Sequence, residues 1–269
     1  MSLGTAYLLP GAKLLTEKDT GFYETYRGII ETPTGKIPAY VKLLGPKTLV
    51  NELLSTLLGQ ASGLPIPNGF LVTVTAEDYP ESEFLKGQRL ESTLAYGSTN
   101  ADAPSLARRY TVDNQDEDGA FDVLFSIWDG WQEAVVFDEW IANSDRHPGN
   151  LLIGAKNTIW LIDHSHAFKG PMWHRSDLQP ASYTKNLLAI HIERKMTASA
   201  KLKLKGVISS QATTYKSLQM DVIINDSKAG IFLGDEDVNA LTKFIKERIE
   251  KLPDLLSEHI GMPTLYLVN

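Results

Sequence analysis

The first hundred residues carry the pattern of a β-sheet. Five runs rich in β-forming residues are bounded by turn residues, and we expect each to form a strand: 6–15, 22–31, 37–44, 64–75 and 89–96. The turn Thr32-Pro33-Thr34-Gly35 separates the second run from the third, which predicts a hairpin. We therefore expect an antiparallel sheet in this part of the chain.

One stretch within this part has helical periodicity instead. Its apolar positions recur every four residues and so share one helical face: Leu49, Leu53, Leu57 and Ala61. Gly63 follows them and is the residue type that commonly ends a helix. Glu52 is the only acidic residue of this helix and stands among leucines. A buried carboxylate is costly unless it is paired or faces a cleft, so we expect Glu52 to have a cationic partner.

Beyond residue 100 the pattern becomes helical. Apolar and aromatic residues fall at helical spacing in three stretches: 121–128, 135–140 and 238–252. The small polar stretch 101–104 precedes them. The change of pattern predicts an N-terminal lobe over residues 1–100 and a C-terminal lobe over residues 101–269.

Composition narrows the class of protein. Of the 269 residues, 43% are apolar, which is enough to bury a sizeable core. The net charge of −7 argues against a nucleic-acid-binding module. The absence of cysteine excludes disulfides, thiolate zinc sites and a cysteine nucleophile. No apolar run approaches the ~20 residues that cross a bilayer, and residues 1–15 lack the basic start of a signal peptide, so we expect a cytoplasmic protein without membrane insertion.

The most informative segment surrounds a second predicted hairpin. Asp145 is followed five residues later by Asn150, then by the apolar runs 151–153 and 159–162, and then by Asp163. Phosphoryl transfer from ATP needs a carboxylate near the attacking hydroxyl, and an amide oxygen and a second carboxylate around Mg²⁺. Because a hairpin returns the chain to its start, we expect these side chains to meet at one edge of a cleft.

This segment resembles the catalytic motif of the protein-kinase-like superfamily. Asp-Arg-His-x-x-Asn followed by Ile-Asp is similar to its atypical branches, including the phosphatidylinositol 3- and 4-kinases. With Trp-Ile-Ala-Asn before it and Asp-His-Ser-His-Ala-Phe after it, the string most resembles bacterial HipA-like kinase domains. The resemblance implies Asp145 as the catalytic base and Asn150 and Asp163 as Mg²⁺ ligands. It also implies an α+β, two-lobed protein-kinase-like fold, with a small antiparallel-sheet N-lobe and a mainly helical C-lobe.

The same resemblance implies residues that contact ATP. Lys42 lies in Ala-Tyr-Val-Lys-Leu, which resembles the Val-Ala-Ile-Lys strand whose lysine reaches the phosphates, and Glu52 is its expected ion-pair partner. Gly21 is the only glycine in the counterpart of the glycine-rich phosphate loop. Tyr96 stands where the backbone of a linker between the lobes would meet the adenine. His147 is expected to orient its loop or to help neutralise phosphate charge.

Together these features predict an ATP- and Mg²⁺-dependent kinase. HipA-like kinases phosphorylate Ser or Thr of proteins, so a protein hydroxyl is the expected acceptor. Three alternatives stay open: a small-molecule or lipid kinase, an adenylyl transferase, and a noncatalytic nucleotide-binding partner protein. The acidic charge gives no reason to expect a nucleic-acid partner, and the pattern leaves the oligomeric state open.

A zinc hydrolase is a competing interpretation of the histidines. His164 and His166, with His147 or His174 as a third ligand, would leave one zinc coordination position for water. This interpretation explains neither the position of Asn150 nor the hairpin that follows it, so we favour the kinase.

Overall fold

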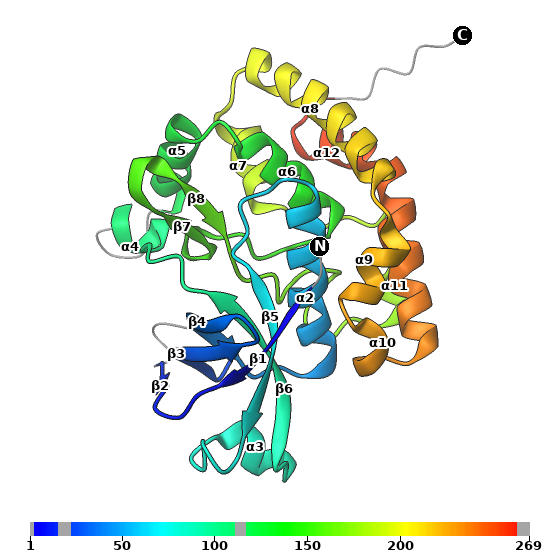
Figure 1. The fold of residues 1–269 in the computed structure, drawn as a ribbon. Coiled ribbons are helices and arrows are strands. Elements are labelled where there is room, and N and C mark those ends of the chain that lie inside the picture. Colours follow the sequence, from blue (N-terminus) through cyan, green and yellow to red (C-terminus); the bar gives the residue numbers. More distant parts are fainter. Residues whose placement is uncertain (1–2, 16–22, 111–116, 263–269) are drawn as a thin grey trace.

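A six-stranded sheet makes up most of the N-terminal region in the computed structural model, which describes residues 3–15, 23–110 and 117–262 (Figure 1). The strand order is β1-β5-β6-β4-β3-β2. The strands are Gly4–Leu8 (β1), Lys13–Leu14 (β2), Thr25–Thr32 (β3), Gly35–Lys42 (β4), Gly69–Thr75 (β5) and Ser92–Thr99 (β6). In the described residues β1 and β5 run parallel and the other pairs are antiparallel, so the predicted sheet is confirmed apart from that pair.

The predicted hairpin is β3 and β4, which pair from Thr25 with Lys42 to Thr32 with Gly35. Gly35 has a φ of +138°, a conformation that residues with a Cβ rarely adopt. Other boundaries differ from the prediction. The expected strand over 6–15 is divided into β1 and β2, and β6 begins three residues later than expected, after a short unpredicted helix, Glu83–Gln88 (α3).

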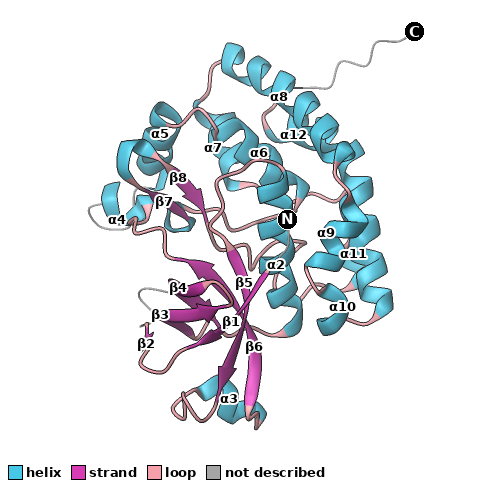
Figure 2. Ribbon diagram, viewed as in Figure 1, coloured by secondary structure: helices cyan, strands magenta, loops and turns pink. Residues whose placement is uncertain are grey.

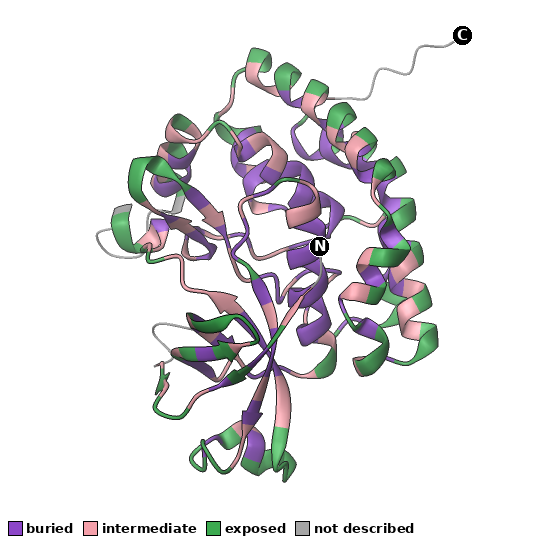
Figure 3. Cartoon of the chain, in the orientation of Figure 1, coloured by how far each residue is buried: buried purple, intermediate pink, exposed green. Residues whose placement is uncertain are grey.

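Helix α2 (Pro46–Ala61) lies between the sheet and the helical region. On one side Leu49 and Leu53 pack in a cluster with Leu71 of β5 and Tyr96 of β6. On the other side Val50, Leu54 and Leu58 belong to the large core of the C-terminal region. Every residue from Thr48 to Gly59 is buried, as the purple ribbon of α2 shows (Figure 3). A helix that is apolar on several faces must be covered on all of them, and that is why α2 is central and not a surface helix.

The C-terminal region is mainly helical, with one small hairpin (Figure 2). Its helices are Leu106–Tyr110 (α4), Glu117–Ile127 (α5), Trp131–Trp140 (α6), Leu187–Lys195 (α7), Ala198–Ser217 (α8), Met220–Asp226 (α9), Ala229–Phe232 (α10), Asp235–Arg248 (α11) and Leu252–His259 (α12). The hairpin strands are Leu151–Ile153 (β7) and Ile159–Leu161 (β8), which pair antiparallel as predicted. At the centre of the core Trp140 of α6 stacks on Tyr215 of α8, with ring centroids 3.9 Å apart.

The predicted boundary between an N-terminal and a C-terminal lobe, near residue 100, falls directly after the end of β6 at Thr99. The division into two lobes stays a prediction. The two regions share core residues, because α2 precedes that position yet packs into the helical region. Within the described part of the chain, no helix combines the length and apolar character needed to span a membrane.

Candidate active site

Lys42 links the sheet, helix α2 and the segment after β8. As the last residue of β4, it places its Nζ 2.9 Å from Glu52 Oε1 and 2.9 Å from Asp163 Oδ2. The second oxygen of Glu52 accepts a hydrogen bond from the His164 backbone N–H at 2.9 Å. Glu52 is fully buried, so the lysine and this N–H compensate a carboxylate that would otherwise be costly. The predicted Lys42–Glu52 ion pair is present.

The two carboxylates and the lysine hold one another in their charged forms. Burial alone would lower the pKa of Lys42, but the charges of Asp163 and Glu52 outweigh it and raise that pKa above the ordinary lysine value. Burial alone would raise the pKa of Asp163, but Lys42, with help from Ser165, lowers it well below the ordinary aspartate value. Asp163 is therefore a carboxylate throughout the physiological pH range.

Asp163 has a backbone conformation that fixes where its side chain points. It follows β8 by two residues and has a φ of +57°, which is uncommon outside glycine and asparagine. Its Oδ1 accepts a hydrogen bond from the Ser165 hydroxyl at 2.7 Å. With Oδ2 on Lys42, each carboxylate oxygen has a partner from the chain.

Asn150 and Asp145 are joined directly. The Asn150 side-chain Nδ2 donates to the backbone carbonyl of Asp145 at 2.8 Å, and this bond sets the orientation of the amide. The amide oxygen accepts no hydrogen bond from any residue that the structure describes, so it remains available as a ligand. The backbone carbonyl of Asn150 also accepts from the N–H of Ile162, the residue before Asp163. The hairpin thus brings the predicted residues to one place, as expected.

His147 lies beside Asp145 on the same loop. Its Nδ1 accepts a hydrogen bond from the Gly149 N–H at 3.0 Å, so the proton of the neutral ring is on Nε2. That nitrogen lies 3.9 Å from Asp145 Oδ2, and both side chains are 39% exposed. An incoming molecule can reach both side chains, which are more exposed than Lys42 and Asp163.

Arg146 is a site residue that the sequence reasoning missed. Its fully buried guanidinium pairs with both oxygens of Asp138 and donates to the carbonyls of Asn150 (3.2 Å) and Ile162 (2.6 Å). The first carbonyl belongs to Asn150, a predicted Mg²⁺ ligand, and the second belongs to the residue before Asp163, the other predicted ligand. The one available signal was its position inside the Asp-Arg-His string, because nothing else distinguishes it from a surface arginine.

The prediction for Tyr96 is wrong in its geometry. Residues 94–98 lie within β6, where all five pair with β5 and 96–98 pair with β4 as well, so they belong to the sheet and are not a linker after it. The Tyr96 side chain faces α2, where its hydroxyl meets that of Thr56 at 2.9 Å, and burial raises its pKa. The chain leaves the sheet only after Thr99. Gly21, the other predicted nucleotide contact, lies outside the described residues.

The histidines do not form the zinc site of the competing interpretation. No group of three or more His, Cys, Asp or Glu side chains that could hold a metal ion occurs among residues 3–15, 23–110 and 117–262. The His164 ring is buried edge-on against Phe137 and is 3.8 Å from Glu52. By contrast, the carboxylate of Asp163 and the free amide oxygen of Asn150 are the hard oxygen ligands that Mg²⁺ prefers, so these two residues fit that ion.

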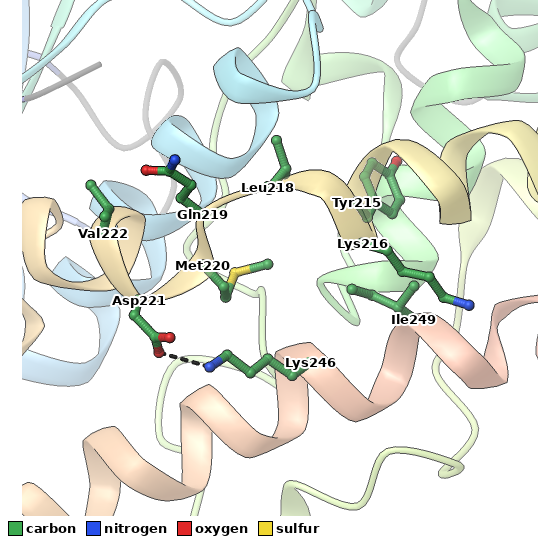
Figure 4. A pocket seen from close by; sticks show the side chains of 9 residues that line it. All are labelled: Tyr215, Lys216, Leu218, Gln219, Met220, Asp221, Val222, Lys246 and Ile249. Carbon is green, nitrogen blue, oxygen red and sulfur yellow. Dashed lines mark hydrogen bonds and ion pairs between the residues drawn. The ribbon is translucent and has the colours of Figure 1, made fainter.

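A pocket of about 500 Å³ lies elsewhere, between α8, α9 and α11 (Figure 4). Both of its lysines are paired with carboxylates, Lys216 with Glu250 at 2.8 Å and Lys246 with Asp221 at 2.7 Å. None of the predicted site residues lines it, so its size alone does not connect it with the candidate active site.

The sequence and the fold were compared with known proteins. A family model described as HipA-like kinase matches residues 40–229, which is more than half of the chain. The chain belongs to the HipA-like kinase family. The matched range of this HipA-like kinase contains Lys42, Glu52, Asp145, Asn150 and Asp163. No curated protein sequence matches the chain.

The fold of this HipA-like kinase is similar to the crystal structure of a Helicobacter pylori proinflammatory kinase, CtkA. The two are 10% identical with a TM-score of 0.57, and the match covers 94% of this chain and 97% of that chain. At this identity the likeness concerns the fold alone. It confirms the predicted architecture, a sheet-rich N-terminal region followed by a helical C-terminal region.

Proposed function

We propose that this HipA-like kinase transfers a phosphoryl group from ATP, in a Mg²⁺-dependent reaction, to a Ser or Thr hydroxyl of a protein. The observation that carries the proposal is the position of Lys42, whose ammonium is held 2.9 Å from both Glu52 and Asp163. Phosphoryl transfer depends on a fixed cation for the phosphates and a fixed carboxylate for the metal, and this arrangement supplies both.

The chain's own residues then have distinct roles. Asn150 and Asp163 would hold Mg²⁺, which when bound supplies charge neutralisation at the phosphates. Lys42 would contact the phosphates while Glu52 keeps it in place. Asp145, whose side chain is partly exposed and which is hydrogen-bonded to Asn150, would accept the proton of the attacking hydroxyl. His147 would orient Asp145 through its Nε2–H.

The choice of a protein acceptor rests on the family, whose members phosphorylate Ser or Thr. The partial exposure of the Asp145 and His147 side chains leaves both accessible to a large acceptor. The noncatalytic alternative needs neither Asp145 nor its link to Asn150. Because both are in place, we favour turnover.

The test is the intact mass of the purified chain after incubation with ATP, Mg²⁺ and a mixed protein acceptor, together with the loss of ATP. We expect a phosphoryl-sized gain on chain or acceptor that Asp163→Ala abolishes. Asp129→Ala, which removes an exposed carboxylate from the loop before α6, is the matched control and should leave transfer unchanged. Asp145→Asn should lose transfer but bind ATP with nearly unchanged affinity.

The other outcomes separate the alternatives. An adenylyl-sized gain in mass would mean that this kinase-like fold transfers an adenylyl group and not a phosphoryl group. If ATP is consumed only when a small molecule or a lipid is added, and not when protein is added, the acceptor is that molecule and not a protein. ATP binding without turnover under all these conditions would favour the noncatalytic partner protein. Full transfer by Asp145→Asn would contradict the assignment of the base.

A further inference from the structure

Asn51, the residue before Glu52 on α2, makes four long-range hydrogen bonds. Its Nδ2 lies within hydrogen-bond distance of three backbone carbonyls, those of Ser165 (2.9 Å), Ala167 (2.9 Å) and Gly170 (3.0 Å), so one of its two N–H groups is shared between two of them. Its Oδ1 accepts from the indole Nε1–H of Trp173 at 3.1 Å. The Asn51 side chain is fully buried, so every one of its polar groups is used inside the protein.

The segment that Asn51 contacts has a shape that its own residues do not favour. Residues 165–173 form no helix or strand, so their carbonyls lack the partners that regular structure would provide. Three consecutive residues have positive φ: Phe168 (+53°), Lys169 (+80°) and Gly170 (+118°). Left-handed conformations at two residues with a Cβ need support from their surroundings. The three carbonyls converge on one amide, which supplies that support.

Two other residues of α2 extend the contact along the same segment. The Thr48 hydroxyl donates to the carbonyl of Pro171 at 3.2 Å, and Lys47 Nζ donates to the carbonyl of Trp173 at 2.7 Å. Lys47 also lies over the Trp173 ring, 4.5 Å from its centroid. The first two turns of α2 therefore hold residues 165–173 over their whole length.

These contacts close a ring through the candidate active site. Asp163 begins the segment and pairs with Lys42, Lys42 pairs with Glu52, and Glu52 is adjacent to Asn51 on α2. Asn51 then returns to the segment at Ser165, whose hydroxyl binds Asp163. If the segment separated from α2, Asp163 would no longer be held beside Lys42. The ion pair between Lys42 and Glu52 would remain, because it does not involve the segment.

We propose that Asn51 is a positioning residue that couples helix α2 to the segment after Asp163 and so keeps the Asp163 carboxylate in register with Lys42. The expected effect on turnover rests on the proposed kinase function. The coupling of α2 to the segment does not depend on that function.

The test compares the wild-type chain with Asn51→Ala by hydrogen exchange and by steady-state kinetics. We expect the amides of residues 165–173 to exchange about tenfold faster or more, since three buried carbonyls lose the Asn51 donor and, among the described residues, only that of Ala167 keeps another, the Gly170 N–H. We expect kcat to fall by at least about tenfold while the KM for ATP changes little, because Lys42 and Glu52 remain paired.

Asn186→Ala is the matched control. Asn186 is also a fully buried asparagine, and it donates to the carbonyl of Val135 and accepts from Ala189 N–H, away from the site. At equal unfolding free energy, this variant should leave both the exchange of residues 165–173 and kcat at wild-type levels. Equal effects of the two variants would mean that Asn51 is merely structural and would overturn the inference.

Trp173→Phe keeps the test decisive if Asn51→Ala does not fold. It removes the indole donor to Asn51 and shrinks the buried ring beneath Lys47, both at the end of the segment, so we expect faster exchange confined to that end and a smaller fall in kcat. Unchanged exchange in this variant would overturn the inference. If the wild-type chain turns over no ATP, the proposed function fails, whereas the exchange comparison still decides whether Asn51 couples α2 to the segment.

Discussion

Arg146 and Asp138 form a bidentate ion pair in full burial, with Nε–Oδ2 and Nη2–Oδ1 distances of 3.0 Å each. Replacing Arg146 by Met would leave the Asp138 carboxylate buried without its counter-ion. We expect a loss of about 3–5 kcal/mol in the free energy of unfolding, measured by urea denaturation. Arg194→Ala, at an exposed arginine of α7, should change it by less than about 0.5 kcal/mol.

The double variant Arg146→Met/Asp138→Asn separates stability from positioning. Removing both charges should recover part of the lost unfolding free energy, because no unpaired charge remains. Turnover should stay low, because the carbonyls of Asn150 and Ile162 still lack the arginine donor. Recovery of turnover together with stability would show that Arg146 has no positioning role.

The low pKa of Asp163 predicts how acid affects the fold. A group whose pKa is lower in the folded state stabilises it above the pKa of the unfolded chain, and that stability is lost as the pH falls. The unfolded value is about 3.9, so the stability advantage of the wild type over Asp163→Asn should shrink by about 1 kcal/mol between pH 5 and pH 3. Denaturation curves at a series of pH values measure it. A constant difference over that range would contradict the ion pair with Lys42.

Gly149 is required by the position of His147. A Cβ at residue 149 would lie 2.5 Å from the His147 Cε1 and 2.8 Å from its Nδ1, so the ring would have to leave its position beside Asp145. We expect Gly149→Ala to lower the rate of phosphoryl transfer by about tenfold to a hundredfold with little change in ATP affinity. Gly154→Ala, in the connection of the hairpin that follows, is the control, because its Cβ would meet neighbours only at 3.6 Å or more. Equal rates in the two variants would refute this role for His147.

Tyr96→Phe tests whether this side chain contacts the nucleotide. The variant removes the hydroxyl that meets Thr56 inside the protein, so the unfolding free energy should fall by about 1 kcal/mol. The KM for ATP should stay within about twofold of wild type, because the ring faces α2. A large rise in KM without loss of stability would restore Tyr96 as a nucleotide contact.

Local pattern determined much of this protein. The β3–β4 and β7–β8 hairpins, helix α2 and the arrangement of Asp145, Asn150 and Asp163 were all predictable, because period-two and period-four spacings and turn residues act over short stretches. A lone acid among leucines requires a partner, and the resemblance to the Val-Ala-Ile-Lys strand implied that Lys42 is the partner of Glu52.

Only the tertiary structure decided which distant groups meet. Nothing in the local pattern shows that Asn51 serves three carbonyls more than a hundred residues away, or that β6 runs between β4 and β5. For the same reason Tyr96 was misplaced and Arg146 was missed. Hydrogen bonds and ion pairs between remote segments depend on how the whole core packs around α2. The type of a polar residue does not show whether its side chain is buried or exposed.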